Sequence, residues 1–164
     1  NEDFKSLPNA NEMCWYCYEG DPHKGSKVYE QNGHLQNVNG IWLKKKAKIL
    51  ADEHINASDM ERGHLFDNIY YIDCRAELPP SMPPEPQIKT TPPANTNDYF
   101  FLPASGYYAY GRLLFFGRCG EYWSPSSNPT SGLTAYAMVF DLVWNRIYVS
   151  FMNRPTGCSI QPFE

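Results

Sequence analysis

The sequence predicts an α+β fold in a single domain spanning residues 1–164. A helical pattern near the amino end is followed, from Tyr99 onward, by short segments in which apolar and polar residues alternate between glycines. Helical and strand patterns that are segregated along a chain are typical of helices packed on one side of antiparallel sheets. The length also allows one domain with a substantial core.

The composition favours a globular protein that binds something other than a nucleic acid. Charged residues make up 20% and aromatic residues 15% of the chain, and binding surfaces use aromatic side chains heavily. The net charge of -4 argues against a nucleic-acid partner, which requires a basic face. The short basic run at Lys44, Lys45 and Lys46 is expected to be the solvated end of a helix or strand. No apolar stretch approaches the roughly 18 residues of a membrane span. Residues Asn1–Ala10 show no signal-peptide pattern, and the same would be expected of a mature or excised domain.

The chain has five cysteines, an odd number, and the pair Cys14 and Cys17 is predicted to be buried and inert. Cys14 and Cys17 form a CxxC motif, but it lies in a predicted helix and no second CxxC follows. Zinc usually takes four ligands at paired spacing, and a redox pair usually follows a strand. A zinc site completed by His23 and His34 and a redox pair are therefore the weaker alternatives.

The first half contains one well-marked helix. Asn9 is a candidate N-cap, Glu12 has the spacing of a capping box, and Gly20-Asp21-Pro22 ends the pattern. Residues 23–40 are polar and rich in turn signals, which predicts a loop. A short strand or an apolar plug is expected at 41–43, and a strand at 69–72.

The second half is predicted to be a proline-rich loop followed by short strands. Residues 77–98 cannot form a helix or a central strand, so we expect an extended loop on the surface. A strand at Tyr99–Leu102 is ended by Pro103, and Gly106, Gly111, Gly117 and Gly120 are expected in loops. Alternation over 136–141 and 147–152 predicts two strands, joined by a hairpin turn that ends at Asn145.

With these segments identified, the chain resembles the bacterial "major paralogous" domains, which share the C-type-lectin-like fold of formylglycine-generating enzymes. The similar motifs, as they stand in this sequence, are Leu7-Pro8-Asn9-Ala10-Asn11-Glu12, Phe101-Leu102-Pro103-Ala104 with Gly106, Gly120-Glu121-Tyr122-Trp123-Ser124, Ala135-Tyr136 with Met138 and Phe140, and Asn153-Arg154 with Gly157 and Ile160. The resemblance implies a C-type-lectin-like fold with two helices and small twisted antiparallel sheets. Two departures are the glycine-free turn at 142–146 and the ending Cys158–Phe163.

The amino-terminal half is similar to a subgroup that includes the variable proteins of diversity-generating retroelements. The matching segments are Asn9–Tyr16, Gly20–His23, Gly33–Leu35 and Trp42–Lys46. In such proteins a fixed frame carries replaceable residues near the carboxyl end. This resemblance implies that the alternation after Tyr99 separates structural residues from contact residues.

The contact residues are expected between frame residues that hold the fold. The expected frame is Gly111, Leu113, Gly117, Tyr122, Trp123, Ala135, Tyr136, Phe140, Val149 and Gly157, with Arg154 fixing the last loop. The expected ligand-binding residues, all predicted to face solvent, are Tyr110, Phe115, Phe116, Arg118, Glu121, Asn128, Thr130, Leu133, Thr134, Val139, Trp144, Arg146, Tyr148, Ser150 and Met152. For Phe115, Phe116 and Leu114, core packing is an equal alternative.

The predicted function is recognition of a protein or glycan on another cell or virion, with no cofactor, no metal and no catalysis. The domain is expected at a cell surface or outside the cell, on a pilus, lipoprotein or phage particle. The alternatives are a structural domain for pilus assembly and a carbohydrate-binding lectin. A calcium lectin is disfavoured because Glu121, Asn128 and Asp141 are well separated in the sequence. An enzyme would need Cys119 and Cys158 to be reactive, and only Arg118 could lower a thiol pKa there. The oligomeric state is left open.

Overall fold

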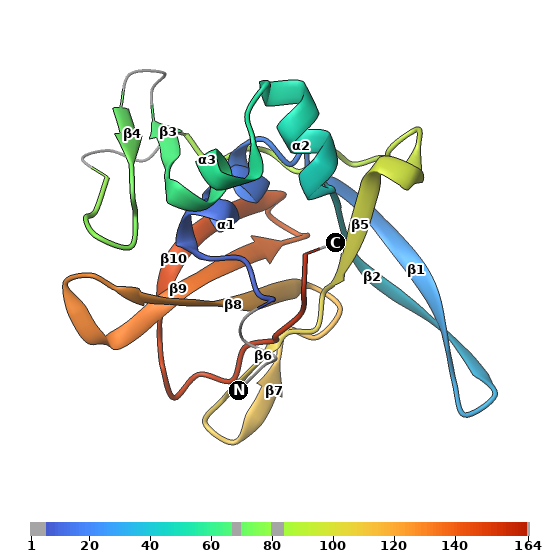
Figure 1. The fold of residues 1–164 in the computed structure, drawn as a ribbon. Coiled ribbons are helices and arrows are strands. Elements are labelled where there is room, and N and C mark those ends of the chain that lie inside the picture. Colours follow the sequence, from blue (N-terminus) through green and yellow to red (C-terminus); the bar gives the residue numbers. More distant parts are fainter. Residues whose placement is uncertain (1–5, 67–69, 80–83, 164) are drawn as a thin grey trace.

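The structure is a computed structural model that describes residues 6–66, 70–79 and 84–163 (Figure 1). The described residues form the helices α1 (Ala10–Tyr18), α2 (Lys46–Glu53) and α3 (Ala57–Arg62), and the strands β1 (His23–Gln31), β2 (His34–Lys44), β3 (His64–Phe66), β4 (Tyr70–Ile72), β5 (Tyr99–Pro103), β6 (Tyr107–Ala109), β7 (Arg112–Leu114), β8 (Cys119–Asn128), β9 (Ser131–Asp141) and β10 (Arg146–Asn153). Each helix is too short to cross a lipid bilayer.

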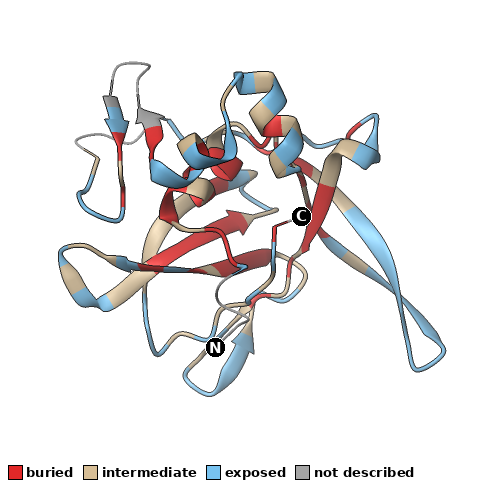
Figure 2. Cartoon of the chain, in the orientation of Figure 1, coloured by how far each residue is buried: buried red, intermediate tan, exposed pale blue. Residues whose placement is uncertain are grey.

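The α+β class predicted from the sequence is confirmed, with one more α-helix than expected. Two three-stranded sheets have the orders β1-β2-β5 and β10-β9-β8, and β3-β4 and β6-β7 form small hairpins. In Figure 1 the three helices lie together on one side of the β10-β9-β8 sheet. Burial is concentrated between this sheet, α1 and β5 (Figure 2), so the core lies where the helices meet the sheets.

Helix α1 forms where the sequence predicts it. The side chain of Asn9 accepts hydrogen bonds from the backbone N–H groups of Asn11 and Glu12, and the Glu12 carboxylate accepts from the N–H of Asn9 at 2.9 Å. These bonds satisfy backbone donors that the first turn leaves unpaired. Cys14 and Cys17 are buried, as predicted. The helix is buried on nearly all sides, which is typical of a central helix.

The loop predicted at residues 23–40 is wrong, because these residues form the long antiparallel hairpin β1–β2. Its turn is Asn32-Gly33, with φ of 52° and 77°, the conformation that favours Asn-Gly in a two-residue hairpin. The outer half of the hairpin is exposed (Figure 2), and most of its residues are polar. The strand expected at 41–43 is the inner end of β2, which pairs with β5.

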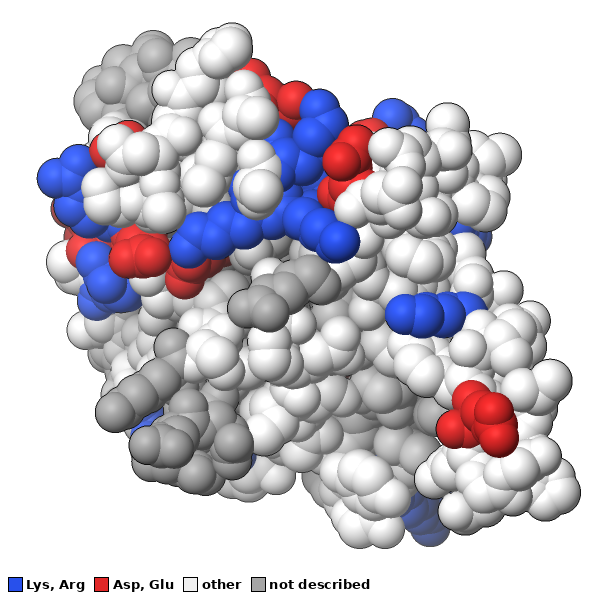
Figure 3. Space-filling model, turned by 45° about the vertical axis from the view of Figure 1, so that its right-hand side comes forward, with Lys and Arg blue, Asp and Glu red and all other residues white. Residues whose placement is uncertain are grey.

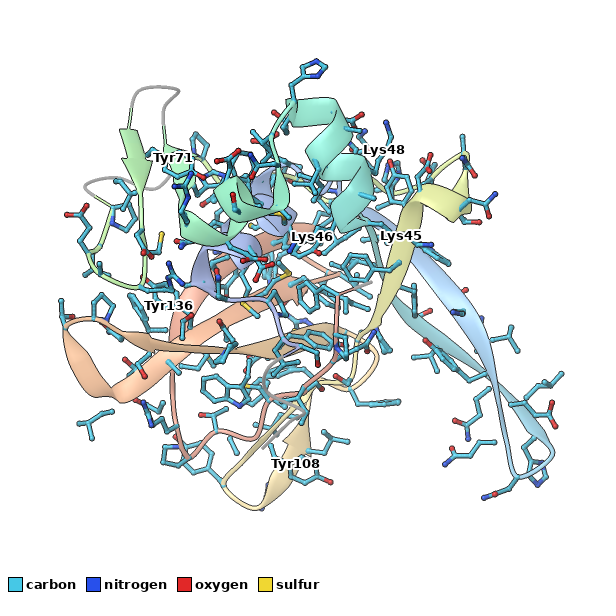
Figure 4. All side chains as sticks on the ribbon, viewed as in Figure 1. Lys45, Lys46, Lys48, Tyr71, Tyr108 and Tyr136 are labelled. Carbon is cyan, nitrogen blue, oxygen red and sulfur yellow. The ribbon has the colours of Figure 1, made fainter. Side chains whose placement is uncertain are left out.

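The basic run ends β2 and begins α2, as predicted. Lys44 pairs with Asp52 at 2.7 Å, and Lys46 pairs with Glu12 at 2.8 Å and with Glu61 at 3.2 Å. Figure 3 shows the basic side chains of this region with acidic groups beside them, and Figure 4 labels Lys45, Lys46 and Lys48 at the start of α2. The run is therefore largely neutralised by its neighbours.

The β10-β9-β8 sheet confirms the two predicted strands and their hairpin. Arg146 lies opposite Asp141, and Asn145 has the positive φ, 54°, expected at the end of the turn. One face of the sheet packs into the core through Tyr122, Met138, Phe140 and Ile147. Gly120 lies within β8, paired with Phe140, rather than in the expected loop, and the ring of Phe140 occupies the space that a Cβ would need there.

The proline-rich segment lies along β1 and the β9–β10 turn. The N–H of Ile88 donates to the carbonyl of Asn145 at 2.9 Å, and the N–H of Lys24 donates to the carbonyl of Lys89 at 2.7 Å. Glu85 also accepts two hydrogen bonds from Arg146. Described residues 84–95 contain no helix or multi-residue strand, and a short 3₁₀ turn follows at Thr96–Asp98. Of the strand expected at 69–72, β4 covers 70–72, and residue 69 lies outside the described residues.

Candidate functional site

The β6–β7 hairpin displays Tyr110 at its tip. Tyr110 and Gly111 form a two-residue turn with φ of 53° and 71°, and the tyrosine side chain is 98% exposed. A tyrosine at positive φ costs about 1 kcal/mol or more, and a turn of this kind favours asparagine or glycine. The stability of the fold therefore gives no reason for tyrosine at this position, whereas an intermolecular contact does.

The loop after β7 displays two further aromatic side chains. Phe115 and Phe116 are both exposed, and Phe115 also has a positive φ, 55°. The Phe115 ring lies 5.8 Å from that of Tyr107 and 5.1 Å from the guanidinium carbon of Arg118. Core packing, the alternative left open by the sequence, is thus wrong for Phe115 and Phe116, while Leu114 is half-buried.

Arg118 and Asp141 hold the neighbouring hairpin turn in place. The guanidinium of Arg118 donates to the Asp141 carboxylate at 2.8 and 3.0 Å, and the backbone N–H groups of Val143 and Trp144 donate to the same carboxylate. Burial raises the pKa of Asp141, but these donors outweigh it and lower the pKa to about 2. The carboxylate is thus an internal anchor, and the Trp144 side chain projects into solvent.

A groove of about 560 Å³ lies between the β6–β7 hairpin and the end of β10. Tyr107 and Tyr110 form one side, and Leu133 and Met152 lie on the other. Leu133 is 78% exposed at the start of β9. A chain of contacts joins the groove to the β9–β10 turn. Tyr107 contacts Phe115, Phe115 contacts Arg118, and Arg118 pairs with Asp141, which holds the turn that carries Trp144. We call the aromatic residues Tyr110, Phe115, Phe116 and Trp144, together with the aliphatic Leu133, the exposed aromatic surface.

The fifteen expected contact residues fall into three groups. Exposed are Tyr110, Phe115, Phe116, Thr130, Leu133, Trp144 and Arg146; half-buried are Arg118, Asn128, Thr134, Tyr148, Ser150 and Met152; buried are Glu121 and Val139. The expected solvent exposure is wrong for Glu121 and Val139, each only 5% exposed. Leu113, expected to hold the fold, is exposed instead.

Glu121 and Val139 are buried because both lie in the interior of the sheet. Val139 is in the central strand, directly between Glu121 and Tyr148. The segment after β10 pairs with β8, since the N–H of Ser159 donates to the carbonyl of Glu121 at 2.8 Å. This pairing brings the Cys158 thiol to 3.4 Å from the Glu121 carboxylate. Burial raises the pKa of Glu121, while the thiol hydrogen bond partly opposes the increase.

Several of the other expected contact residues are already engaged within the protein. Asn128 donates to Thr134 at 3.0 Å and accepts from Thr130 at 2.9 Å, so these three residues stabilise the β8–β9 turn. Arg146 is paired with Glu85 and lies over the Tyr148 ring, with 5.1 Å between the guanidinium carbon and the ring centre. Their polar groups are therefore less available to a ligand than the exposed aromatic surface is.

The thiols near this surface are poorly suited to nucleophilic chemistry. Burial raises the pKa of Cys119 to about 12, and the charge of Asp141 adds to the effect despite the opposing charge of Arg118. Burial and the adjacent Glu121 likewise raise the pKa of Cys158. Since the thiolate is the nucleophile, both thiols lack activation. Within the described ranges, no group of three or more His, Cys, Asp or Glu side chains is placed to hold a metal ion.

A second concave site lies beside the irregular part of β8. It measures about 470 Å³, and Trp123, Ser127 and Arg154 are among the residues that line it. Trp123 and Arg154 were expected to hold the fold, but Trp123 is half-buried and Arg154 is exposed.

Comparison with family models, with curated proteins and with solved structures finds no match to this chain.

Proposed function

We propose that this chain is a ligand-recognition domain with a C-type-lectin-like fold, and that the exposed aromatic surface contacts the ligand. The observation that carries the proposal is the exposure of five large apolar side chains in this half of the chain, two of which, Tyr110 and Leu133, line one groove. An exposed apolar group of this kind marks an interaction site more often than a structural feature. Aromatic side chains also give a large contact area at a low cost in conformational entropy.

The ligand is a protein or glycan on another cell or virion, bound by a domain displayed at a surface. The contact residues are replaceable, as in the variable proteins of diversity-generating retroelements. Support comes from where they lie, since Tyr110, Phe115 and Trp144 are in turns or at turn boundaries outside the core. Changing such side chains leaves the packing of Tyr122 and Phe140 untouched. The low reactivity of the nearby thiols favours recognition over catalysis.

A displayed library tests whether the surface is replaceable. In one library, Tyr110, Phe115, Phe116, Leu133 and Trp144 are randomised on yeast, and in a matched library five core positions are randomised, namely Tyr122, Tyr136, Met138, Phe140 and Ile147. Most members of the first library should fold, and selection against a probe protein such as lysozyme should yield binders. Loss of folding in the first library to the extent seen in the second would overturn the proposal.

The encoding DNA tests the diversification itself. A nearby near-copy of the 3′ end of the gene, differing mainly at adenines, together with a linked reverse transcriptase, is the expected arrangement. The lack of both around the gene would exclude a retroelement-diversified protein while leaving ligand recognition open.

Assembly with other subunits is a second candidate function. The β1–β2 hairpin projects from the body of the molecule (Figure 1), and Val28 and Leu35 on it are exposed. An isolated two-stranded hairpin is only marginally stable in water, so a neighbouring subunit would stabilise it. Sedimentation velocity separates assembly from ligand recognition. A protein that stays monomeric up to high concentration and has no affinity for other subunits counts against assembly.

A further inference from the structure

Arg154 differs in its partners from most other arginines of the described residues. Arg62, Arg75, Arg118 and Arg146 each have a carboxylate oxygen within 2.7–2.9 Å. Arg154 has no carboxylate within ion-pair distance among the described residues, and its guanidinium makes one hydrogen bond there, from Nη2 to the hydroxyl of Ser127 at 2.8 Å. An arginine side chain carries five N–H donors in a planar fork, so the other donors are available.

The guanidinium group of Arg154 is nevertheless held in place. The backbone N–H of Arg154 donates to the carbonyl of Leu133 at 3.2 Å, which fixes the start of the side chain. The bond to Ser127 then orients its far end. A donor that is already oriented loses less conformational entropy when a ligand binds.

The pocket of about 470 Å³ combines this cation with an apolar wall. Trp123 is half-buried and lines the pocket together with Pro125, Ala135 and Arg154, and the lining contains no acidic residue. The volume suits one sugar-sized group, at the small end of the range for ligand sites.

We propose that this pocket binds a carboxylated sugar, such as a hexuronic acid. The guanidinium of Arg154 pairs with the carboxylate in a bidentate geometry, the Trp123 side chain packs against the C–H face of the pyranose ring, and the Ser127 hydroxyl contributes a further polar group. Binding of this kind needs no calcium. The pocket adjoins Leu133 but shares no lining residue with the groove beside Tyr110, so its ligand can be tested whether or not the exposed aromatic surface binds anything.

The test is a titration of the purified chain with methyl β-D-glucuronide, followed by calorimetry and by the NMR signals of the indole N–H groups. The Trp123 signal, assigned with Trp123→Phe, should shift on saturation, with a dissociation constant on the order of 1 mM. Methyl β-D-glucoside, which lacks the carboxylate, and acetate, which lacks the ring, should bind at least about tenfold more weakly. Addition of EDTA should change nothing.

Variants separate the pocket from general charge effects. Arg154→Gln should weaken glucuronide binding at least about tenfold, because it removes a charge-assisted hydrogen-bonded pair. Arg112→Gln is the matched control, since Arg112 is also exposed and has no carboxylate partner among the described residues. It should bind like the wild type, as should Tyr110→Ala.

Three results would overturn the proposal. The first is a lack of saturable glucuronide binding at concentrations up to roughly tens of millimolar. The second is equal binding of glucuronide and glucoside, and the third is glucuronide binding that Arg154→Gln leaves unchanged. If Arg154→Gln does not fold, the wild-type Trp123 signal and Ser127→Ala decide. Ser127→Ala should weaken binding severalfold, because the guanidinium loses its orienting bond. Any of these failures would leave the exposed aromatic surface and its function untouched.

Discussion

The hydroxyl of Tyr136, in β9, donates a hydrogen bond of 2.7 Å to the carbonyl oxygen of Cys74, in the turn after β4. Both residues are buried, and Figure 4 shows Tyr136 beneath the helices. The bond joins the carboxyl-terminal sheet to the β3–β4 segment, which lies outside that sheet. The N–H of Cys74 in turn donates to the side chain of Asn11 in α1 at 2.8 Å. Three parts of the molecule therefore meet at Cys74.

Tyr136→Phe should lower the free energy of unfolding by about 1–2 kcal/mol, because it leaves a buried carbonyl without its donor. Urea unfolding followed by circular dichroism measures the change. Tyr108→Phe is the control, since that side chain is exposed on β6 and should lose less than about 0.5 kcal/mol. Equal effects of the two substitutions would show that the Tyr136–Cys74 bond adds no stability.

Gly120→Ala should destabilise the domain by about 3 kcal/mol or prevent folding. A Cβ there would lie 2.3 Å from two atoms of the Phe140 ring, which is itself fully buried and cannot move without disturbing the core. Gly132→Ala is the matched control, since a Cβ at Gly132 meets no atom within 4 Å. Its unfolding midpoint should stay near that of the wild type. A well-folded Gly120→Ala protein would contradict the close packing of β8 on β9.

Tyr110→Asn should stabilise the protein by about 1 kcal/mol, because asparagine tolerates the positive φ of this turn better than tyrosine does. Tyr108→Asn, in the same hairpin but without a positive φ, should give no such gain. Thermal unfolding of both variants checks the prediction. A loss of stability in Tyr110→Asn would mean that the tyrosine packs within its own chain, which would weaken its assignment to ligand contact.

Stability should fall as the pH drops from 6.5 toward 4, because of His64. This side chain is 2% exposed, its ring centre lies 4.6 Å from that of Trp15, and burial lowers its pKa from 6.5 to about 4. Below pH 6.5 the unfolded chain therefore takes up a proton on His64 that the folded chain does not. The stability that depends on neutral His64 is thus fully present only above pH 6.5. By pH 4 the loss approaches about 3 kcal/mol.

Urea midpoints measured between pH 7 and 4 test this dependence. His64→Gln should flatten the profile in that range, whereas a variant at exposed His34 should keep it. The pKa of Asp141 is lowered to about 2, so its contribution is lost mainly below pH 4 and is separable. An unchanged profile in His64→Gln would show that His64 is not the group responsible.

Local signals in the sequence were enough to predict α1 and the β9–β10 hairpin. The Asn9–Glu12 capping box and the alternation around Phe140 and Ile147 each depend on residues that are close in sequence. The β1–β2 hairpin was missed because its outer strands are exposed on both faces and lack apolar alternation. The Asn32-Gly33 dipeptide is the local signal for this hairpin turn.

Solvent exposure at the candidate site was predicted less well than strand position. Alternation placed Glu121 and Val139 on the face opposite Phe140, which is their side of the sheet. It could not predict that the segment carrying Cys158 would return to β8 and bring its thiol to Glu121. Contacts of that kind depend on residues far apart in the chain, as does the half-exposed position of Trp123.

The hydroxyl of Tyr16 in α1 donates to the carbonyl of Phe163 at 3.0 Å, across 147 positions of the chain. Ser126 in β8 likewise caps the amino end of α1 by accepting from the N–H of Ala10 at 3.0 Å. The core thus closes only when the two ends of the described chain have met, and a long loop must be ordered before that contact forms. Chains dominated by such distant pairings fold slowly, on a scale of milliseconds to seconds. During synthesis, α1 therefore waits for β8 and the final segment before it can be buried.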